Sequence, residues 1–203
     1  MIGIINYEAG NIASVTNALK RLNVAFNVTN NKDELDQCAG YIFPGVGHAY
    51  SAMKSLEDHN LIGWMRNIDK PLLGVCLGMQ LLFEESEEGS SNGLGIIPGK
   101  LKKFDPQRGK VPHMGWNTFT RINEHDLLKG IKKEDYFYYV HSYYAPVNAY
   151  TLATCEYITP FASVVCRNNF YGVQFHPEKS SSSGERLLSN FLHIVKNWSS
   201  VTI

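Results

Sequence analysis

The first half of the chain alternates short apolar runs with segments whose apolar residues recur every three or four positions. Short apolar runs between turns predict strands, and the three-to-four-residue recurrence predicts helices. We expect strands at 1–7, 25–29, 41–43 and 71–75. We expect helical segments at 12–22, 32–38, 49–68 and 79–85. Strands that alternate with helices predict an α/β fold whose sheet is mostly parallel, with right-handed crossovers.

After about residue 93 the pattern changes to stretches rich in β-branched and aromatic residues, which favour strands. We expect β structure at 94–101, 116–122, 136–144, 152–157, 161–167 and 170–175. These strands extend the sheet or add an antiparallel layer in the C-terminal half. The polar run 179–184 is predicted to be a loop whose serines cap a last helix at 185–198. Neither a repeat nor a boundary interrupts the pattern, so we expect a single domain over 1–203.

Composition and charge favour a globular protein and argue against binding to nucleic acids or membranes. With 203 residues, 44% hydrophobic and 19% charged, the chain can bury a core of its own. Nineteen basic and nineteen acidic side chains cancel, and no basic run occurs, so nothing attracts nucleic acid or an anionic membrane. The apolar N-terminal run lacks a basic flank and is too short for a signal peptide or a membrane span. We therefore expect a cytoplasmic protein whose partners are small molecules or proteins.

The cysteines point to single thiols and away from cross-links. The chain has Cys38, Cys76, Cys155 and Cys166, none of them in a close pair, and a chain of this length does not need disulfides. No Cys-x-x-Cys or His-x-x-x-His spacing is present, so we expect no metal site.

One of these thiols, Cys76, lies in the segment Gly-Val-Cys-Leu-Gly, where a predicted strand gives way to a predicted helix. Glycines on both sides of a nucleophile permit the sharp, strained turn of a nucleophile elbow. Free N–H groups at a helix start favour a thiolate, and the N–H of Leu77 can face a developing oxyanion. The alternative is that Cys76 is an ordinary small, buried apolar residue.

A second candidate segment is Phe-His-Pro-Glu, which contains His176 and Glu178. A residue before proline favours extended backbone, so we expect His176 at the exposed end of a strand. Residues two apart in an extended segment project to the same side, which lets the Glu178 carboxylate reach one ring nitrogen and leaves the other for Cys76. Such a carboxylate fixes the tautomer and stabilises the imidazolium. The alternative is a surface ion pair of little energetic weight.

A third segment, Pro-Gly-Val-Gly at 44–47, follows a predicted strand at the sheet edge where α/β proteins bind ligands. Glycines around Val46 allow its peptide to turn inward and offer a second N–H to an oxyanion. The alternative is a tight turn without function.

These three segments occur in the order oxyanion strand, cysteine elbow and His-x-Glu, each at a strand end. Val-Cys-Leu-Gly-Met-Gln and Phe-His-Pro-Glu-Lys resemble the class I, triad-type glutamine amidotransferases. Further motifs resemble one branch of that family, the glutaminase subunits of imidazole glycerol phosphate synthases: Tyr7-x-x-Gly10-Asn11-x-x-Ser14-Val15, Val-Pro-His-Met-Gly-Trp-Asn at 111–117, and His-Ser-Tyr at 141–143. The resemblance runs from about residue 2 to the C-terminal helix.

The resemblance implies a flavodoxin-like glutaminase fold that hydrolyses L-glutamine without a cofactor. It implies that Cys76 is the nucleophile, His176 the general base and then acid, and Glu178 its orienting carboxylate. The backbone N–H groups of Leu77 and Val46 would form the oxyanion hole. The residues implied to hold glutamine are Gly47, Gln80, His141, Ser142 and Tyr143.

The resemblance also implies a partner, a (β/α)8-barrel cyclase that receives ammonia and makes imidazole glycerol phosphate in histidine biosynthesis. Asn11, Trp116 and Lys179 are expected to face it. Without the resemblance these three would be a helix cap, a core tryptophan and a surface lysine. Other hypotheses remain open: a glutaminase subunit of another synthase, making anthranilate or pyridoxal phosphate, a catalytically silent docking subunit, and a cysteine peptidase.

Overall fold

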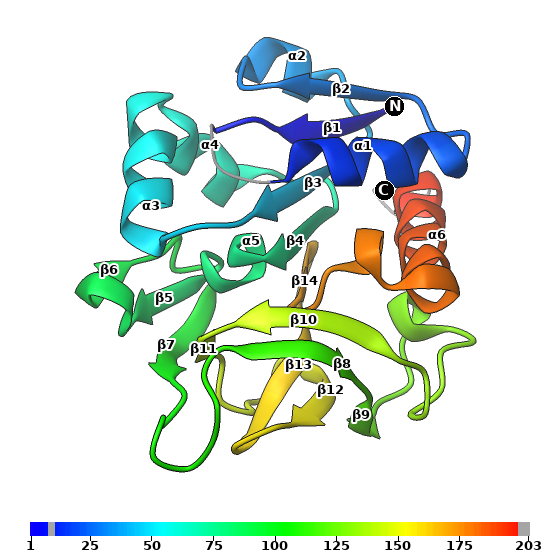
Figure 1. Cartoon of the computed structure of the whole chain (residues 1–203). Coiled ribbons are helices and arrows are strands. Elements are labelled where there is room, and N and C mark those ends of the chain that lie inside the picture. The colour runs from blue at the N-terminus through cyan, green and yellow to red at the C-terminus, as the bar shows by residue number, and fades with distance from the viewer. Residues whose placement is uncertain (8–10, 199–203) are drawn as a thin grey trace.

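In a computed structural model, which describes residues 1–7 and 11–198, an eight-stranded mixed sheet forms the centre of the molecule (Figure 1). Its strand order is β2-β1-β3-β4-β14-β13-β12-β9. The first five of these run parallel: β2 (Phe26–Thr29), β1 (Ile2–Ile5), β3 (Gly40–Gly45), β4 (Leu72–Cys76) and β14 (Phe170–Val173). The last three add antiparallel pairings: β13 (Pro160–Arg167), β12 (Thr151–Glu156) and β9 (Phe119–Ile122). The predicted parallel sheet with an antiparallel C-terminal extension is confirmed.

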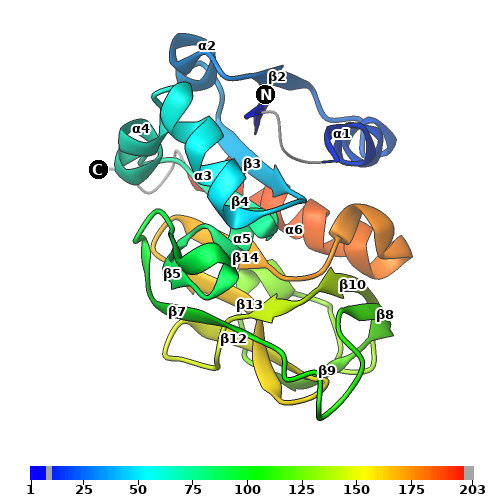
Figure 2. The same cartoon turned by 60° about the vertical axis from the view of Figure 1, so that its left-hand side comes forward.

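Helices cover both faces of the parallel part. One apolar cluster joins Ile4 of β1 to α1 (Ile12–Arg21) and α6 (Ser181–Trp198). The other joins Ile5, the next residue of β1, to α3 (Ala49–Asp58) and α4 (Leu61–Asn67). Because successive strand residues point to opposite faces, one apolar run supplies both cores. Figure 2 shows α1 and α3 on opposite sides of this sheet, with the short helix α2 (Lys32–Asp36) beyond its edge.

Two smaller sheets lie against the main one. In the first, β8 (His113–Asn117) pairs antiparallel with β10 (Phe137–His141), with His113 opposite His141 and Trp116 opposite Tyr138. We call this pair the β8–β10 ribbon. The second has the order β11-β7-β5-β6, from Tyr143–Tyr144, Ile97–Lys103, Phe83–Ser86 and Ser91–Asn92. Three 3₁₀ turns complete the described elements, at Glu88–Ser90, Asp126–Leu128 and Pro177–Lys179.

Several predicted boundaries were wrong. The helix expected at 49–68 is two helices, because Asn60 takes a left-handed backbone conformation with φ 55°. The helix expected at 79–85 is only the short α5 (Leu77–Gln80) followed by β5, since the carbonyls of Leu81 and Leu82 accept hydrogen bonds from the backbone of 94–97. The serines expected in a loop begin α6, which starts at Ser181.

In the C-terminal half the predicted strand 116–122 divides at Thr118 between the ribbon and the main sheet. The stretch 136–144 divides at Ser142 into β10 and β11, and the strand expected at 94–101 begins at Ile97. No helix within 1–7 and 11–198 is long and apolar enough to cross a membrane.

Candidate active site

Cys76 occupies a nucleophile elbow. It is the last residue of β4 and directly precedes α5, with φ 54° and ψ −108°. A side chain on Gly74 would place its Cβ 2.7 Å from the carbonyl oxygen of Gly78, and one on Gly78 would collide with the carbonyl oxygen of Phe43. The predicted role of the two glycines is thus confirmed. The strained turn directs the thiol to the carboxyl end of the parallel strands, where such sheets bind ligands.

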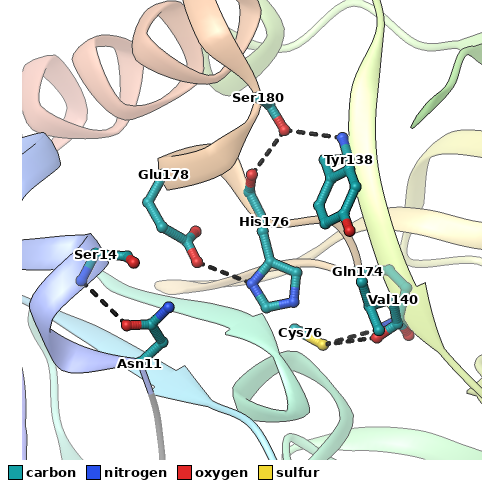
Figure 3. Close-up of polar contacts among 9 residues, drawn as sticks. All are labelled: Asn11, Ser14, Cys76, Tyr138, Val140, Gln174, His176, Glu178 and Ser180. Carbon is teal, nitrogen blue, oxygen red and sulfur yellow. Dashed lines mark hydrogen bonds and ion pairs between the residues drawn. The ribbon is translucent and has the colours of Figure 1, made fainter. Parts of the chain in front are cut away.

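His176 and Glu178 form a buried pair beside this thiol. Nδ1 of His176 lies 2.8 Å from Oε1 of Glu178, and the two side chains are 4% and 2% exposed. In Figure 3 the other ring nitrogen of His176 faces Cys76. The expected exposed strand end was wrong: His176 lies three residues beyond β14 and is buried, and Glu178 belongs to a 3₁₀ turn that begins at Pro177. A solvated surface pair is therefore excluded.

The main chain of His176 is fixed by the β8–β10 ribbon. Its N–H donates to the carbonyl of Tyr138 at 2.9 Å. The Ser180 hydroxyl donates to the carbonyl of His176 at 2.6 Å and accepts from the N–H of Tyr138 at 3.0 Å (Figure 3). A displacement of the His176 backbone would therefore break hydrogen bonds with β10.

Electrostatics favour a charged imidazole next to the thiol. Burial lowers the pKa of His176, but hydrogen bonds with Cys76 and Glu178 outweigh it and raise this pKa to about 10. All four cysteines are free. Burial raises the pKa of Cys38, and raises that of Cys155 to about 12 and that of Cys166 to about 11, so these three remain neutral thiols. Cys76 is the thiol that has an imidazolium as its neighbour.

A cavity of about 340 Å³ opens at Cys76, large enough for a small amino acid. Ten of the thirteen predicted site residues line it, and Glu178, Asn11 and Trp116 do not. The lining consists of Val46, Gly47, Cys76, Leu77, Gln80, Glu88, Pro112, Val140, His141, Ser142, Tyr143, His176 and Lys179. Residues from the ends of β3, β4 and β10 and from the turn after β14 thus converge on one space.

The Gln80 side chain is already oriented by the protein. Its amide nitrogen donates to the Tyr143 carbonyl and to Oε1 of Gln174, each at 3.0 Å. Because these bonds use both amide hydrogens, Gln80 can offer a ligand only its oxygen, which suits an α-ammonium group. Gln174 is fully buried, and its own amide nitrogen lies 3.8 Å from Sγ of Cys76. Sequence reasoning missed Gln174, although a polar residue two positions before His176 in an apolar segment was an available signal.

The oxyanion strand packs tightly on the elbow. A Cβ on Gly45 would lie 2.6 Å from the backbone nitrogen of Gly78. The buried Tyr7 hydroxyl donates to the Pro44 carbonyl at 2.9 Å, and burial raises the pKa of Tyr7. Gly47 adopts φ 110°, a conformation that favours glycine. Val46 is partly exposed at the cavity edge. The assignment of Val46 and Leu77 as oxyanion donors stays a prediction.

Of the three predicted partner residues, Lys179 lines the cavity, whereas Asn11 and Trp116 do not. Asn11 caps α1 by accepting from the N–H of Ser14 (Figure 3). Trp116 is 52% exposed on the outer side of the β8–β10 ribbon, so it is not a core residue. Its ring makes an edge contact with Tyr138 at 5.8 Å. Lys179 is exposed at the cavity. Whether these three residues contact a partner stays a prediction.

Comparison with known families identifies the class that this fold and site define. The family model described as glutamine amidotransferase class-I matches residues 3–195, and the chain belongs to that family. A solved protein from Thermoplasma acidophilum, described as part of a putative GMP synthase, shares the fold, with a TM-score of 0.75 and 17% identity over 98% of this chain and 96% of that one. A second structure, a glutamine amidotransferase, has a TM-score of 0.73 at 18% identity over 96% of this chain and 98% of that one.

Curated relatives lie in one branch of the family. The imidazole glycerol phosphate synthase subunit HisH of Bacteroides fragilis is 46% identical over 195 residues, which cover 95% of this chain and 99% of that protein. Subunit HisH 2 of Legionella pneumophila is 45% identical, over 96% of this chain and 98% of its own length.

Proposed function

We propose that this chain is the glutaminase subunit of an imidazole glycerol phosphate synthase. It hydrolyses L-glutamine to L-glutamate and ammonia and passes the ammonia to a (β/α)8-barrel cyclase in histidine biosynthesis, in the cytoplasm. The observation that carries the chemistry is the buried His176–Glu178 pair, 2.8 Å between Nδ1 and Oε1, beside the strained elbow of Cys76. Relatives of 45–46% identity, named as HisH subunits, support the choice of synthase.

The reaction follows from the positions of these groups. The Cys76 thiolate adds to the side-chain carboxamide carbon of glutamine, and the carbonyl oxygen becomes an oxyanion. His176, held protonated through Nδ1 by Glu178, gives its other ring proton to the departing nitrogen, so ammonia leaves and a thioester remains. A water molecule then gives a proton to His176 and adds to the thioester, which releases glutamate and the thiolate. The net reaction converts glutamine and water into glutamate and ammonia, and it regenerates the Cys76 thiolate and the protonated His176.

Two backbone N–H groups hold the oxyanion in this proposal, those of Leu77 and Val46. Leu77 begins α5 directly after Cys76, and Val46 follows β3, which pairs in parallel with β4 up to Gly45 opposite Cys76. Loss of one such donor costs on the order of a hundred- to a thousandfold in rate. The oxygen of Gln80 and the turn of His141, Ser142 and Tyr143 hold the α-amino and carboxylate ends of glutamine, with Gly47 adding a backbone contact.

The cyclase docks on the outer side of the β8–β10 ribbon in this proposal. Met114, Trp116 and Tyr136 are 62%, 52% and 60% exposed there, an apolar surface suited to a protein partner. Asn11 and Lys179 extend the contact toward the cavity. Because the ribbon also fixes the backbone of His176, docking has a physical route to the catalytic group. We expect little glutaminase activity from the isolated chain and stimulation by a cyclase with bound nucleotide.

The test is ammonia release from glutamine by the purified chain, alone and with the cyclase and its nucleotide substrate. Strong stimulation by the liganded cyclase supports the proposal. High glutaminase activity of the isolated chain argues against activation by the cyclase. If no ammonia appears with the cyclase, but a pull-down recovers another synthase that restores activity, the chain is a glutaminase subunit of that synthase.

A further inference from the structure

A chain of hydrogen bonds leads from the cavity into the β8–β10 ribbon through two histidines that take no part in the proton transfers of the proposed reaction. Nδ1 of His141 lies 2.8 Å from the Tyr143 carbonyl oxygen. Nε2 of His141 lies 3.1 Å from Nδ1 of His113. The other His113 nitrogen, Nε2, lies 3.3 Å from the amide nitrogen of Asn117. Both imidazoles are buried, and they face each other across the two ribbon strands.

Only one arrangement of hydrogens satisfies this chain. A carbonyl oxygen can only accept, so His141 donates from Nδ1 and, when neutral, accepts at Nε2. His113 must then donate from Nδ1 and accept at Nε2. Asn117 completes the chain as a donor, because its side-chain oxygen accepts from the N–H of Thr118 and its nitrogen also donates to the Glu156 carbonyl. The Asn117 amide therefore fixes the tautomer of His113, and His113 fixes the tautomer of His141.

The environment keeps both rings neutral and still. Burial lowers the pKa of His113 to about 4. Burial lowers the pKa of His141 to about 3, and the neighbouring His113 and His176 lower it further, while the Tyr143 carbonyl opposes the shift. The His113 ring is stacked between Tyr139 and Tyr157, at centroid distances of 4.9 and 4.2 Å. It does not line the cavity, so it cannot touch a ligand there.

The Tyr143 carbonyl, where the chain ends, also accepts from the Gln80 amide at 3.0 Å. Gln80 in turn bonds Gln174, whose amide lies 3.8 Å from the thiol of Cys76. The hydrogen of His141 thus sets the position of a carbonyl on which the orientation of Gln80 depends. Within the proposed function, Gln80 and the 141–143 turn are the groups that hold glutamine.

We propose that His113 is a positioning residue for glutamine: its Nδ1–H holds His141 in the tautomer that donates to Tyr143 and so shapes the substrate turn. This inference rests on the proposed function of the same site. It assigns His141 to support of the turn, since both of its ring nitrogens are engaged within the protein. The glutamine contacts then come from the Ser142–Tyr143 turn and Gln80.

Two substitutions separate the hydrogen bond from the packing. His113→Phe keeps a flat ring between Tyr139 and Tyr157 but removes the donor to His141. His113→Asn loses the ring but keeps an N–H close to the Nδ1 position. His125→Phe is the matched control, because His125 is also partly buried and its side chain also loses a hydrogen bond, from the N–H of Leu127, at the start of a 3₁₀ turn that does not line the cavity.

The experiment measures kcat and KM for glutamine with the chain in complex with its cyclase. We expect His113→Phe to raise KM about tenfold, the equivalent of one lost hydrogen bond, with kcat within about threefold of wild type. We expect His113→Asn to recover most of the affinity and His125→Phe to leave KM unchanged. An unchanged KM in His113→Phe, or a KM in His113→Asn as high as in His113→Phe, overturns the proposal.

A measurement on the unmodified chain keeps the inference testable if a variant does not fold. Nitrogen-15 NMR of the imidazoles should show His113 and His141 neutral at pH 7, each with its hydrogen on Nδ1. A hydrogen on Nε2 of either ring overturns the proposal. If the wild-type complex releases no ammonia from glutamine, the proposed function fails, and the tautomers still decide whether the hydrogen-bond chain exists.

Discussion

The two walls of the cavity at Cys76 are built in different ways. The sheet wall consists of residues at or just beyond the carboxyl ends of β3, β4 and β14, namely Val46, Gly47, Cys76, Leu77, Gln80 and His176. The ribbon wall consists of Val140 and His141 at the end of β10, together with Ser142 and Tyr143, which follow it. On the sheet wall, the reactive thiol stands on the strained backbone of Cys76, which ends the buried strand β4. On the ribbon wall, hydrogen bonds from the side chains of His113, His141 and Gln80 fix the His141 ring and the Tyr143 carbonyl. The difference suggests that chemistry resides on the first wall and substrate fit and partner response on the second.

The largest expected effect tests the sheet wall. Cys76→Ala removes the nucleophile, so ammonia release by the complex should fall by roughly a thousandfold or more. Cys166→Ala is the control, because that thiol is free but burial raises its pKa to about 11 and keeps it unreactive. Both variants are assayed for ammonia and for thermal unfolding. A folded Cys76→Ala variant with substantial glutaminase activity contradicts the account.

Glu178→Gln should have the next largest effect. It keeps the shape of the side chain but removes the carboxylate that holds Nδ1 of His176 at 2.8 Å. General acid–base catalysis contributes about 10²–10⁴-fold, and we expect kcat to fall within that range. Because the hydrogen bond with Glu178 helps to raise the pKa of His176, its loss should also move the alkaline limb of the pH–rate profile to lower pH. A profile that keeps its alkaline limb would show that Glu178 does not hold the imidazolium.

On the ribbon wall, Trp116→Ala should affect the partner and spare the chemistry. Exposed aromatic side chains at the centre of an interface contribute about 2 kcal/mol or more, so affinity for the cyclase should fall roughly thirtyfold. Tyr50→Ala on α3 is the control, since Tyr50 is 61% exposed and belongs to another face. Labelling of Cys76 by a glutamine-like electrophile, in the isolated chain, should be the same in both variants. Unchanged cyclase affinity in Trp116→Ala would place the interface elsewhere.

The smallest expected effect concerns acid stability. A histidine whose pKa is lowered by folding binds a proton more readily in the unfolded chain. Its contribution to the free energy of unfolding is therefore complete above about pH 6.5 and is lost as the pH falls toward its pKa in the folded protein. His113, with a folded pKa of about 4, should follow this rule. Removing it in His113→Phe should reduce the pH dependence of the unfolding free energy between pH 4.5 and 6.5, by at most about 1.4 kcal/mol per pH unit. Urea unfolding at several pH values measures the slope, and an unchanged slope contradicts neutral burial of His113.

The sequence predicted the sheet wall better than the ribbon wall, for a physical reason. Glycines at 74 and 78 and the proline after His176 act locally, so the elbow and the His176–Glu178 pair could be predicted from neighbours in the chain. The contact of His176 with β10 could not, because the hydrogen bonds that make it involve Ser180 and Tyr138, which are 42 residues apart. Hydrogen bonds from the backbone of 94–97 also end the predicted helix 79–85 at Gln80, and the strand β5 follows it.

The ribbon carried weaker local signals. His113 belongs to a segment that resembles the family, but its role depends on His141, 28 residues away across two paired strands. Gln174 is a similar case, since its partners Gln80 and Cys76 come from another strand end. A polar side chain within an apolar stretch is the sequence feature that these two share, and it indicates a buried partner without identifying that partner.

The central claim, that Cys76 forms a covalent intermediate with glutamine, has one direct test. The complex with its liganded cyclase is mixed with glutamine, quenched in acid during turnover, digested and analysed by mass spectrometry. The account predicts a γ-glutamyl thioester on the peptide that contains Cys76, and none on those of Cys38, Cys155 and Cys166. Ammonia release without an adduct on Cys76, or with an adduct on another cysteine, would contradict it.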